Sequence, residues 1–215
     1  MVIDYTPYLQ CSDPYAHSSV IKAIVKVESG GDPWAININK KGVRLLAKPK
    51  TREQAQAWIN WFVKNSYNID IGIAQINIKN IQKMKLNPSD LLDPCLNLKV
   101  AGQILLSNYK NSAKQAKNSD DAVRLAISAY NTGNFRSGFD NGYVNKVMIK
   151  YYDKNPPNYA INIPNSNTPP ITIQESPRNN INNNAKMTTR NVAQKNSNFS
   201  NVKVDLWRKY DDNQS

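Results

Sequence analysis

Glutamate is rare in this 215-residue chain, and one glutamate lies where a carboxylate is hard to explain. The three glutamates are Glu28, Glu53 and Glu175. Glu28 shares a predicted helix face with three apolar residues at i, i+3, i+4 and i+7 spacing, namely Ile21, Ile24 and Val25. Burial and the negative end of the helix dipole both disfavour a charged carboxylate, so we expect a raised pKa for Glu28. That is what a general acid needs near neutral pH, although a glutamate that only caps the rim of the core would fit the same pattern.

The chain shows no pattern for metal or cofactor chemistry. It has two cysteines, Cys11 and Cys95, and one histidine, His17, without a Cys-x-x-Cys pair. We therefore expect no zinc site and no cofactor. Spacing alone leaves two interpretations of the cysteines open, a disulfide or two buried thiols. A disulfide would imply an oxidising compartment.

The composition excludes some classes of protein. With 40% hydrophobic residues the chain can bury a core, which excludes wholesale disorder. It has no run of about 18 apolar residues, so we expect no transmembrane segment. The first ten residues lack the basic and apolar regions of a signal peptide. The net charge of +12 could attract polyanions, but no dense basic run occurs, so diffuse surface charge is favoured over nucleic-acid binding.

A change in composition near residue 155 predicts a domain followed by a tail. All eight glycines lie at or before Gly142, and half of the twelve prolines lie from Pro156 onward. We predict a folded catalytic domain over 1–155 and an Asn- and Pro-rich tail over 156–215, mostly disordered or extended. The apolar stretch within 202–210 is either a sticky strand end, which we favour, or a short docking segment.

Helical spacing dominates residues 1–155. We expect helices that begin at Asp13-Pro14, at the capping box Thr51–Gln54, near Cys95 and at Ser119, and a last helix that carries Val144, Val147, Met148 and Tyr151. The second helix should bury one face, formed by Ala55, Trp58, Ile59 and Phe62. Alternation over 69–73 suggests a short strand or extended turn. The predicted fold class is mainly α (α+β) with a small β element.

Four short blocks of sequence resemble a known family. In chain order they are Val-Glu-Ser-Gly-Gly-Asp-Pro at 27–33, Gly-Ile-Ala-Gln-Ile-Asn at 72–77, Ala-Tyr-Asn-Thr-Gly at 129–133 and Tyr-Val-Asn-Lys-Val at 143–147. Together, over about residues 10–152, the blocks resemble the lytic transglycosylases, whose SLT domain has a lysozyme-like fold. That family cleaves the β-1,4 bond between N-acetylmuramic acid and N-acetylglucosamine in peptidoglycan and forms a 1,6-anhydro ring instead of adding water.

A closer similarity is to the specialised transglycosylases of type IV secretion and conjugation systems. Residues 43–72 look like the insert of that group, and Cys11 and Asp93-Pro94-Cys95 resemble its cysteine positions. The resemblance implies a Cys11–Cys95 disulfide and a protein of the periplasm or cell envelope. It also implies peptidoglycan glycan strands as substrate and envelope proteins of a secretion system as partners of the tail.

The resemblance assigns roles to named residues. Glu28 would act as general acid and then as base. Gln75 and Asn77 would contact the sugars, and Tyr130 and Tyr143 would bond the Glu28 carboxyl group. Ser29 would contact the peptide or lactyl side of the substrate. Asn131 would bond substrate or brace the turn at Gly133. Ala74 stands where many relatives have methionine, which would alter the fit of substrate beside the cleft.

Two other functions fit the same residues. A hydrolytic muramidase of a phage or secretion system would need a second carboxylate, for which Asp32 and Asp70 are candidates. A scaffolding component of an envelope complex would depend on the tail and not on Glu28.

Overall fold

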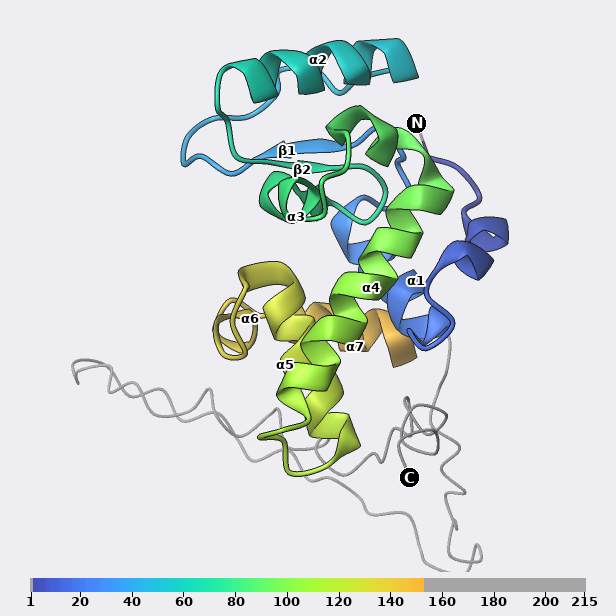
Figure 1. The fold of residues 1–215 in the computed structure, drawn as a ribbon, viewed down its shortest axis with the longest axis vertical. Coiled ribbons are helices and arrows are strands. Elements are labelled where there is room, and N and C mark those ends of the chain that lie inside the picture. The colour runs from blue at the N-terminus through green and yellow to red at the C-terminus, as the bar shows by residue number, and fades with distance from the viewer. Residues whose placement is uncertain (1, 153–215) are drawn as a thin grey trace, which may run out of the picture. The chain divides into compact units, whose positions relative to one another are not determined.

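The structure is a computed structural model that describes residues 2–152. The predicted tail over 156–215 and its possible docking segment at 202–210 lie outside the described residues. Within 2–152 the fold has a helical part and a smaller part built on a sheet, and the long helix α4, Pro94–Ser112, runs through both (Figure 1). None of the helices in this range is long and apolar enough to cross a membrane.

The helical part consists of helices packed in pairs. Its elements are the 3₁₀ helix η1 at Thr6–Cys11, α1 at Ser18–Glu28, α5 at Ser119–Thr132, α6 at Ser137–Asp140 and α7 at Tyr143–Tyr152. Helix α4 packs on α5, and α1 packs on α7. The predicted apolar faces meet in the core, where Ile21, Ile24, Ala101, Leu105, Ile127 and Val147 are fully buried.

The smaller part is a three-stranded antiparallel sheet in the order β1-β2-β3. The strands are β1 at Ile36–Ile38, β2 at Ile69–Ile71 and β3 at Ile76–Asn77. The register aligns Ile36, Ile71 and Ile76 in one row and Asn37, Asp70 and Asn77 in the next. Because side chains alternate along a strand, the two rows face opposite sides of the sheet. The sheet therefore has an apolar row and a polar row.

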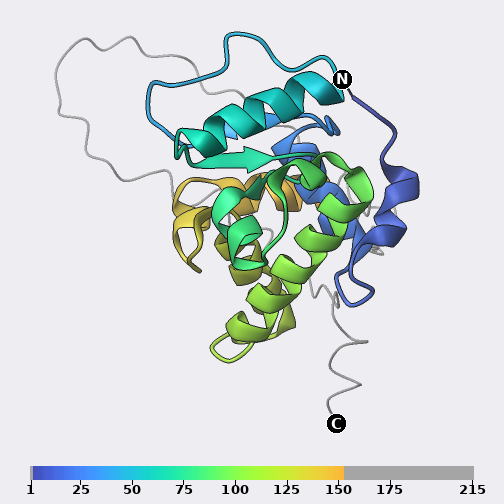
Figure 2. The ribbon, with the colours of Figure 1, turned by 45° about the horizontal axis from the view of Figure 1, so that its top comes forward.

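Helices cover this sheet. They are α2 at Arg52–Lys64, α3 at Ile78–Lys83 and the 3₁₀ helix η2 at Pro88–Leu92. Figure 2 shows α2 lying along the strands, with the chain that joins β1 to α2 arching beside it. The capping residue predicted for α2 is confirmed, because Thr51 Oγ1 accepts a hydrogen bond from Gln54 N at 3.2 Å. The Gln54 side chain accepts from Lys50 N at 2.8 Å instead of from Thr51.

The mainly α prediction with a small β element is confirmed, but two details were wrong. Helix α1 begins at Ser18 and not at Asp13-Pro14. Asp13 instead begins a turn against α4, where a Cβ on Gly102 would lie 2.7 Å from Asp13 N. Trp58 was predicted to be buried with its helix face but is 42% exposed, because the buried face of α2 is limited to Ala55, Ile59 and Phe62.

The disulfide that the resemblance implied is present in the structure. It joins Cys11 at the end of η1 to Cys95 in the first turn of α4, across 84 positions of sequence. In the chain-entropy model, closing a loop of this length stabilises the fold by about 4–5 kcal/mol. The bond holds the N-terminal segment against the helix that connects both parts of the fold.

Candidate active site

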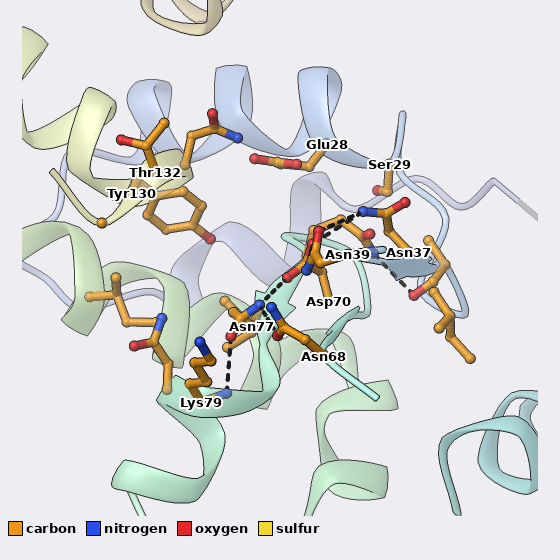
Figure 3. Close-up of a pocket in the computed structure, with 18 of the residues that line it drawn as sticks. Glu28, Ser29, Asn37, Asn39, Asn68, Asp70, Asn77, Lys79, Tyr130 and Thr132 are labelled. Carbon is orange, nitrogen blue, oxygen red and sulfur yellow. Dashed lines mark hydrogen bonds between the residues drawn. The ribbon is translucent and has the colours of Figure 1, made fainter. Parts of the chain in front are cut away.

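A polar cleft of about 890 Å³ lies between the end of α1, the polar row of the sheet and α5. Its lining includes the following residues from the predicted site: Glu28, Ser29, Asp70, Gln75, Asn77, Tyr130 and Asn131. Figure 3 shows Glu28 and Ser29 on one side and the asparagines around Asp70 on another. Segments far apart in the sequence therefore form one site.

Glu28 is the last residue of α1, and its half-buried side chain lies on the wall of this cleft. Burial raises the pKa of Glu28 to about 7, and the nearby negative charge of Asp70 adds to the increase. The Tyr143 hydroxyl donates a hydrogen bond to Glu28 Oε1 at 2.5 Å and lowers the pKa in part. Near neutral pH, both the protonated and the ionised form of Glu28 are therefore populated.

Ser29 joins the turn after α1 to the turn after β2. Its hydroxyl donates to Ile73 O at 2.7 Å and accepts from Gly31 N at 3.0 Å and Asp32 N at 3.1 Å. Gly31 has φ +96, and a Cβ there would also meet the Tyr5 ring at 2.9 Å. The hydroxyl proton of Ser29 is thus used inside the protein, which favours a positioning role over direct contact with substrate.

Tyr130 binds the same turn and not Glu28. Its hydroxyl donates to Ala74 O at 2.8 Å, so the expected hydrogen bond to the Glu28 carboxyl group is made by Tyr143 alone of the two tyrosines. Burial raises the pKa of Tyr130 well above its usual value, so its hydroxyl remains a donor. Ala74 itself is fully buried, so its side chain does not lie beside the cleft as expected.

Gln75 occupies the end of this turn in a left-handed conformation, with φ 51. Its side-chain amide donates to Gly72 O at 2.8 Å and to Ala35 O at 3.0 Å. Both amide hydrogens are used inside the protein. Only the oxygen of this side chain can therefore accept a hydrogen bond from a sugar hydroxyl or N-acetyl group.

A carboxylate surrounded by asparagines occupies the polar row of the sheet. Asp70 Oδ1 accepts from Asn77 Nδ2 at 2.7 Å, and Asp70 Oδ2 accepts from Asn39 Nδ2 at 2.9 Å and from Asn37 Nδ2 at 3.3 Å (Figure 3). Asn77 also caps α3, since its Oδ1 accepts from Lys79 N at 3.0 Å. Both Asp70 oxygens therefore accept hydrogen bonds from asparagine amide groups.

The two candidates for a second acid differ in position. Asp70 lines the cleft with Glu28, whereas Asp32 is not among the lining residues and is only 3% exposed. Asp32 Oδ1 accepts from Trp34 N at 3.1 Å in the turn after α1. The structure thus leaves Asp70 as the candidate for a second acid.

Asn131 is exposed at the cleft, and its Oδ1 accepts a hydrogen bond from Asn141 Nδ2 at 3.0 Å.

Residues 2–152 offer no cluster of three or more histidine, cysteine, aspartate or glutamate side chains that could hold a metal ion.

Asn97 is a site residue that sequence analysis missed. It is fully buried on α4, where its amide donates to Leu91 O at 2.8 Å and to Ile71 O at 2.9 Å, and its oxygen accepts from Ala74 N at 3.0 Å. Gly72, with φ +80, leaves room for this amide, since a Cβ there would collide with Asn97 Nδ2. Asn97 stands four residues before Ala101 on the apolar face of α4, the same signal that identified Glu28.

Comparison with known proteins gives one family and several relatives. The family described as the transglycosylase SLT domain matches residues 11–152. The chain is 40% identical over 134 residues to the protein virB1 of Agrobacterium tumefaciens (strain 15955), covering 62% of this chain and 55% of the relative. It is 34% identical over 145 residues to the type IV secretion system protein virB1 of Brucella abortus (strain 2308), covering 65% and 60%. The chain thus spans less than two thirds of these relatives, and no solved structure matches.

Replacing Asn97 tests whether its amide holds the turn between β2 and β3. Asn97→Ala would leave Ala74 N and two carbonyl oxygens without this partner in the core, so we expect a loss of about 2–4 kcal/mol in the free energy of unfolding. Urea denaturation measures it. Asn111→Ala, at an exposed position of the same helix, is the matched control and should change stability by less than about 0.5 kcal/mol. Equal effects of the two substitutions would contradict the assignment.

Proposed function

Because the chain belongs to the transglycosylase SLT domain family, we propose that it is a peptidoglycan lytic transglycosylase with Glu28 as its acid and base. The substrate is the β-1,4 bond between N-acetylmuramic acid and N-acetylglucosamine, and the product carries 1,6-anhydromuramic acid. The observation that carries the proposal is a glutamate with a pKa of about 7 on the wall of a polar cleft.

The reaction uses both protonation states of Glu28. The protonated carboxyl group gives its proton to the glycosidic oxygen, and the bond between that oxygen and carbon 1 of muramic acid breaks. The hydroxyl at carbon 6 of the same sugar then bonds to carbon 1 and gives its proton to the Glu28 carboxylate. The acid is restored and no water is consumed. A pKa near 7 suits both steps, because neither proton transfer is then strongly unfavourable.

Within this proposal the predicted site residues fall into two groups. Gln75, through its oxygen, and Asn131 contact the sugars from the cleft wall. The positioning residues act through other groups: Tyr143 on the Glu28 carboxyl group, Ser29 and Tyr130 on the turn between β2 and β3, and Asn77 on Asp70. None of these roles requires a metal ion or a cofactor.

We extend the proposal to the cell envelope on the basis of the relatives. Proteins named virB1, including one named as a type IV secretion system protein, are similar to this chain over its SLT domain. The proposed role is local opening of the peptidoglycan for a secretion or conjugation apparatus. Residues 156–215 are the proposed segment for binding its envelope proteins.

Glu28→Gln tests the catalytic assignment. The substitution keeps the size of the side chain but removes the exchangeable proton, so we expect release of anhydromuropeptides from sacculi to fall about 10²- to 10⁴-fold. Mass spectrometry of the soluble products measures both the rate and the type of end. Glu53→Gln, at an exposed position in the first turn of α2, is the matched control. Undiminished release by Glu28→Gln would refute the assignment, and reducing muramic acid ends from the unaltered protein would refute transglycosylation.

Substitutions of the two neighbours of Glu28 should shift the pH profile of activity in opposite directions. The Tyr143 hydroxyl lowers the pKa of Glu28, so Tyr143→Phe should raise it, whereas Asp70 raises that pKa, so Asp70→Asn should lower it. Protonated Glu28 starts the reaction, so kcat/KM should fall as pH rises through about 7. This fall should move to higher pH in Tyr143→Phe and to lower pH in Asp70→Asn. Shifts in the same direction would contradict the electrostatic assignment.

Hydrolysis by a muramidase is a second candidate, favoured by one observation. Asp70 lies in the same cleft as Glu28, and its charge acts on the pKa of Glu28. In a retaining glycosidase a second carboxylate forms a covalent bond to the sugar, and in an inverting one it activates water. In the transglycosylase the hydroxyl at carbon 6 replaces both functions, and Asp70 has only to stabilise the positive charge that develops on the sugar ring.

The products of Asp70→Asn distinguish these two reactions. For a transglycosylase we expect the anhydro product to persist with a rate reduced about tenfold, since only an electrostatic contribution is lost. Digestion in water enriched in oxygen-18 measures hydrolysis directly. Incorporation of the label by the unaltered protein, together with a loss above about 10³-fold in Asp70→Asn, would replace the proposal by the muramidase.

A further inference from the structure

A second cavity, of about 540 Å³, lies between the chain at residues 43–50 and helix α2. We name it the loop groove. Its apolar lining consists of Ile38, Val43, Leu45, Leu46, Ala47, Pro49, Trp58, Trp61, Phe62 and Tyr67. Several of these side chains are exposed to an unusual extent: Leu46 is 100%, Trp61 48% and Trp58 42% exposed. Exposed apolar side chains that gather around one cavity are typical of a binding surface.

The tryptophans of the groove are held in fixed orientations. Trp58 stacks on Phe62 at a centroid distance of 5.6 Å, and Trp61 lies 5.5 Å from the Tyr67 ring. Aromatic side chains ordered in this way offer contact area to a ligand at low cost in conformational entropy. The groove is therefore preformed by side chains of α2.

Positive charge surrounds this apolar surface. The segment 40–52 contains six cationic residues and no acidic residue, and the cations are Lys40, Lys41, Arg44, Lys48, Lys50 and Arg52. Three of them, Arg44, Lys48 and Lys50, line the groove itself. An occupant with both small apolar groups and carboxylates would match this surface.

The loop groove is adjacent to the candidate active site. Lys48 lines both cavities, and strand β1 contributes to both, because Asn37 lines the cleft while Ile38 lines the groove. If a branched ligand is bound in the cleft, a branch that extends past β1 would reach the groove. The two cavities are thus suited to one branched ligand.

We infer that the loop groove binds the stem peptide carried by muramic acid in the glycan strand. This inference rests on the proposed function, because the strand has to lie in the cleft. Each stem peptide combines alanine methyl groups with free carboxylates, so its methyl groups contact Trp58, Trp61 and Leu46 while its carboxylates pair with Arg44 and Lys50. The chain would then distinguish peptide-bearing strands from stripped strands.

Binding to two forms of one polymer tests this inference. The full chain carrying Glu28→Gln is titrated with soluble glycan strands that bear stem peptides, and with the same strands after an amidase has removed the peptides. We expect tighter binding of the peptide-bearing strands. In that background, Arg44→Glu, Lys50→Glu and Leu46→Asn should each reduce the preference about five- to tenfold, whereas Lys99→Glu and Phe139→Ala, exposed outside both cavities, should keep it.

Leu46, Arg44 and Lys50 are not core residues, so their substitution keeps the fold, and circular dichroism of each variant verifies this. A preference that survives all three groove substitutions would overturn the inference and assign the groove to another occupant, such as a protein segment. Equal losses on both forms of the strand would also overturn it. Failure of the proposed function gives a different result, because the unaltered protein would then release no anhydromuropeptides while the binding preference for stem peptides could still be measured.

Discussion

The turn from Gly72 to Gln75 is the structural element on which the candidate site depends. It makes hydrogen bonds with three other segments of the chain. Ser29 Oγ donates to Ile73 O, the Tyr130 hydroxyl donates to Ala74 O, and Asn97 Oδ1 accepts from Ala74 N. The Gln75 side chain closes the turn on itself through Gly72 O. Three of the four sequence blocks that resemble the transglycosylases meet at this turn, and the fourth reaches Glu28 through the Tyr143 hydroxyl. Ser29 and the amide group of Gln75, both expected to contact substrate, are therefore used to build the wall of the cleft.

The surroundings of Glu28 support its proposed double role as acid and base. Burial at the end of α1 disfavours the charged form of Glu28, Asp70 adds to this effect, and the Tyr143 hydroxyl opposes it. The asparagines around Asp70 matter here because their amide groups hold its carboxylate in the same cleft as Glu28. Since a raised pKa means that the folded state binds more protons than the unfolded state, stability is lost as pH rises from about 4.5 to 7. Burial of Glu28 thus lowers the free energy of unfolding at the pH where the site would be active.

Periodicity in the sequence was sufficient to predict the long helices but not the elements that complete the cleft. Helices α1, α4 and α5 carry long apolar faces, so their existence and Glu28 could be predicted. Strand β1 has only three residues and α3 only six, too few for a period to be recognised. The position of β1 follows from its pairing with β2, and α3 directly follows β3, which pairs with β2 as well. Asn97 follows the same rule as Glu28, a polar residue on an apolar helix face, but it is neutral and therefore attracted no attention.

The hydrogen bonds made inside the protein limit how the cleft can recognise its substrate. Asn77, Ser29, Tyr130 and the amide group of Gln75 have protein partners, so donors for a sugar chain have to come from other residues of the lining, such as Lys79 and Asn80. Contacts with sugar hydroxyl groups add little specificity, because these groups are similar along a polysaccharide. The groups that distinguish peptidoglycan from other β-1,4 glycans lie on its branches. A cationic and aromatic surface next to the cleft would add recognition of these branches.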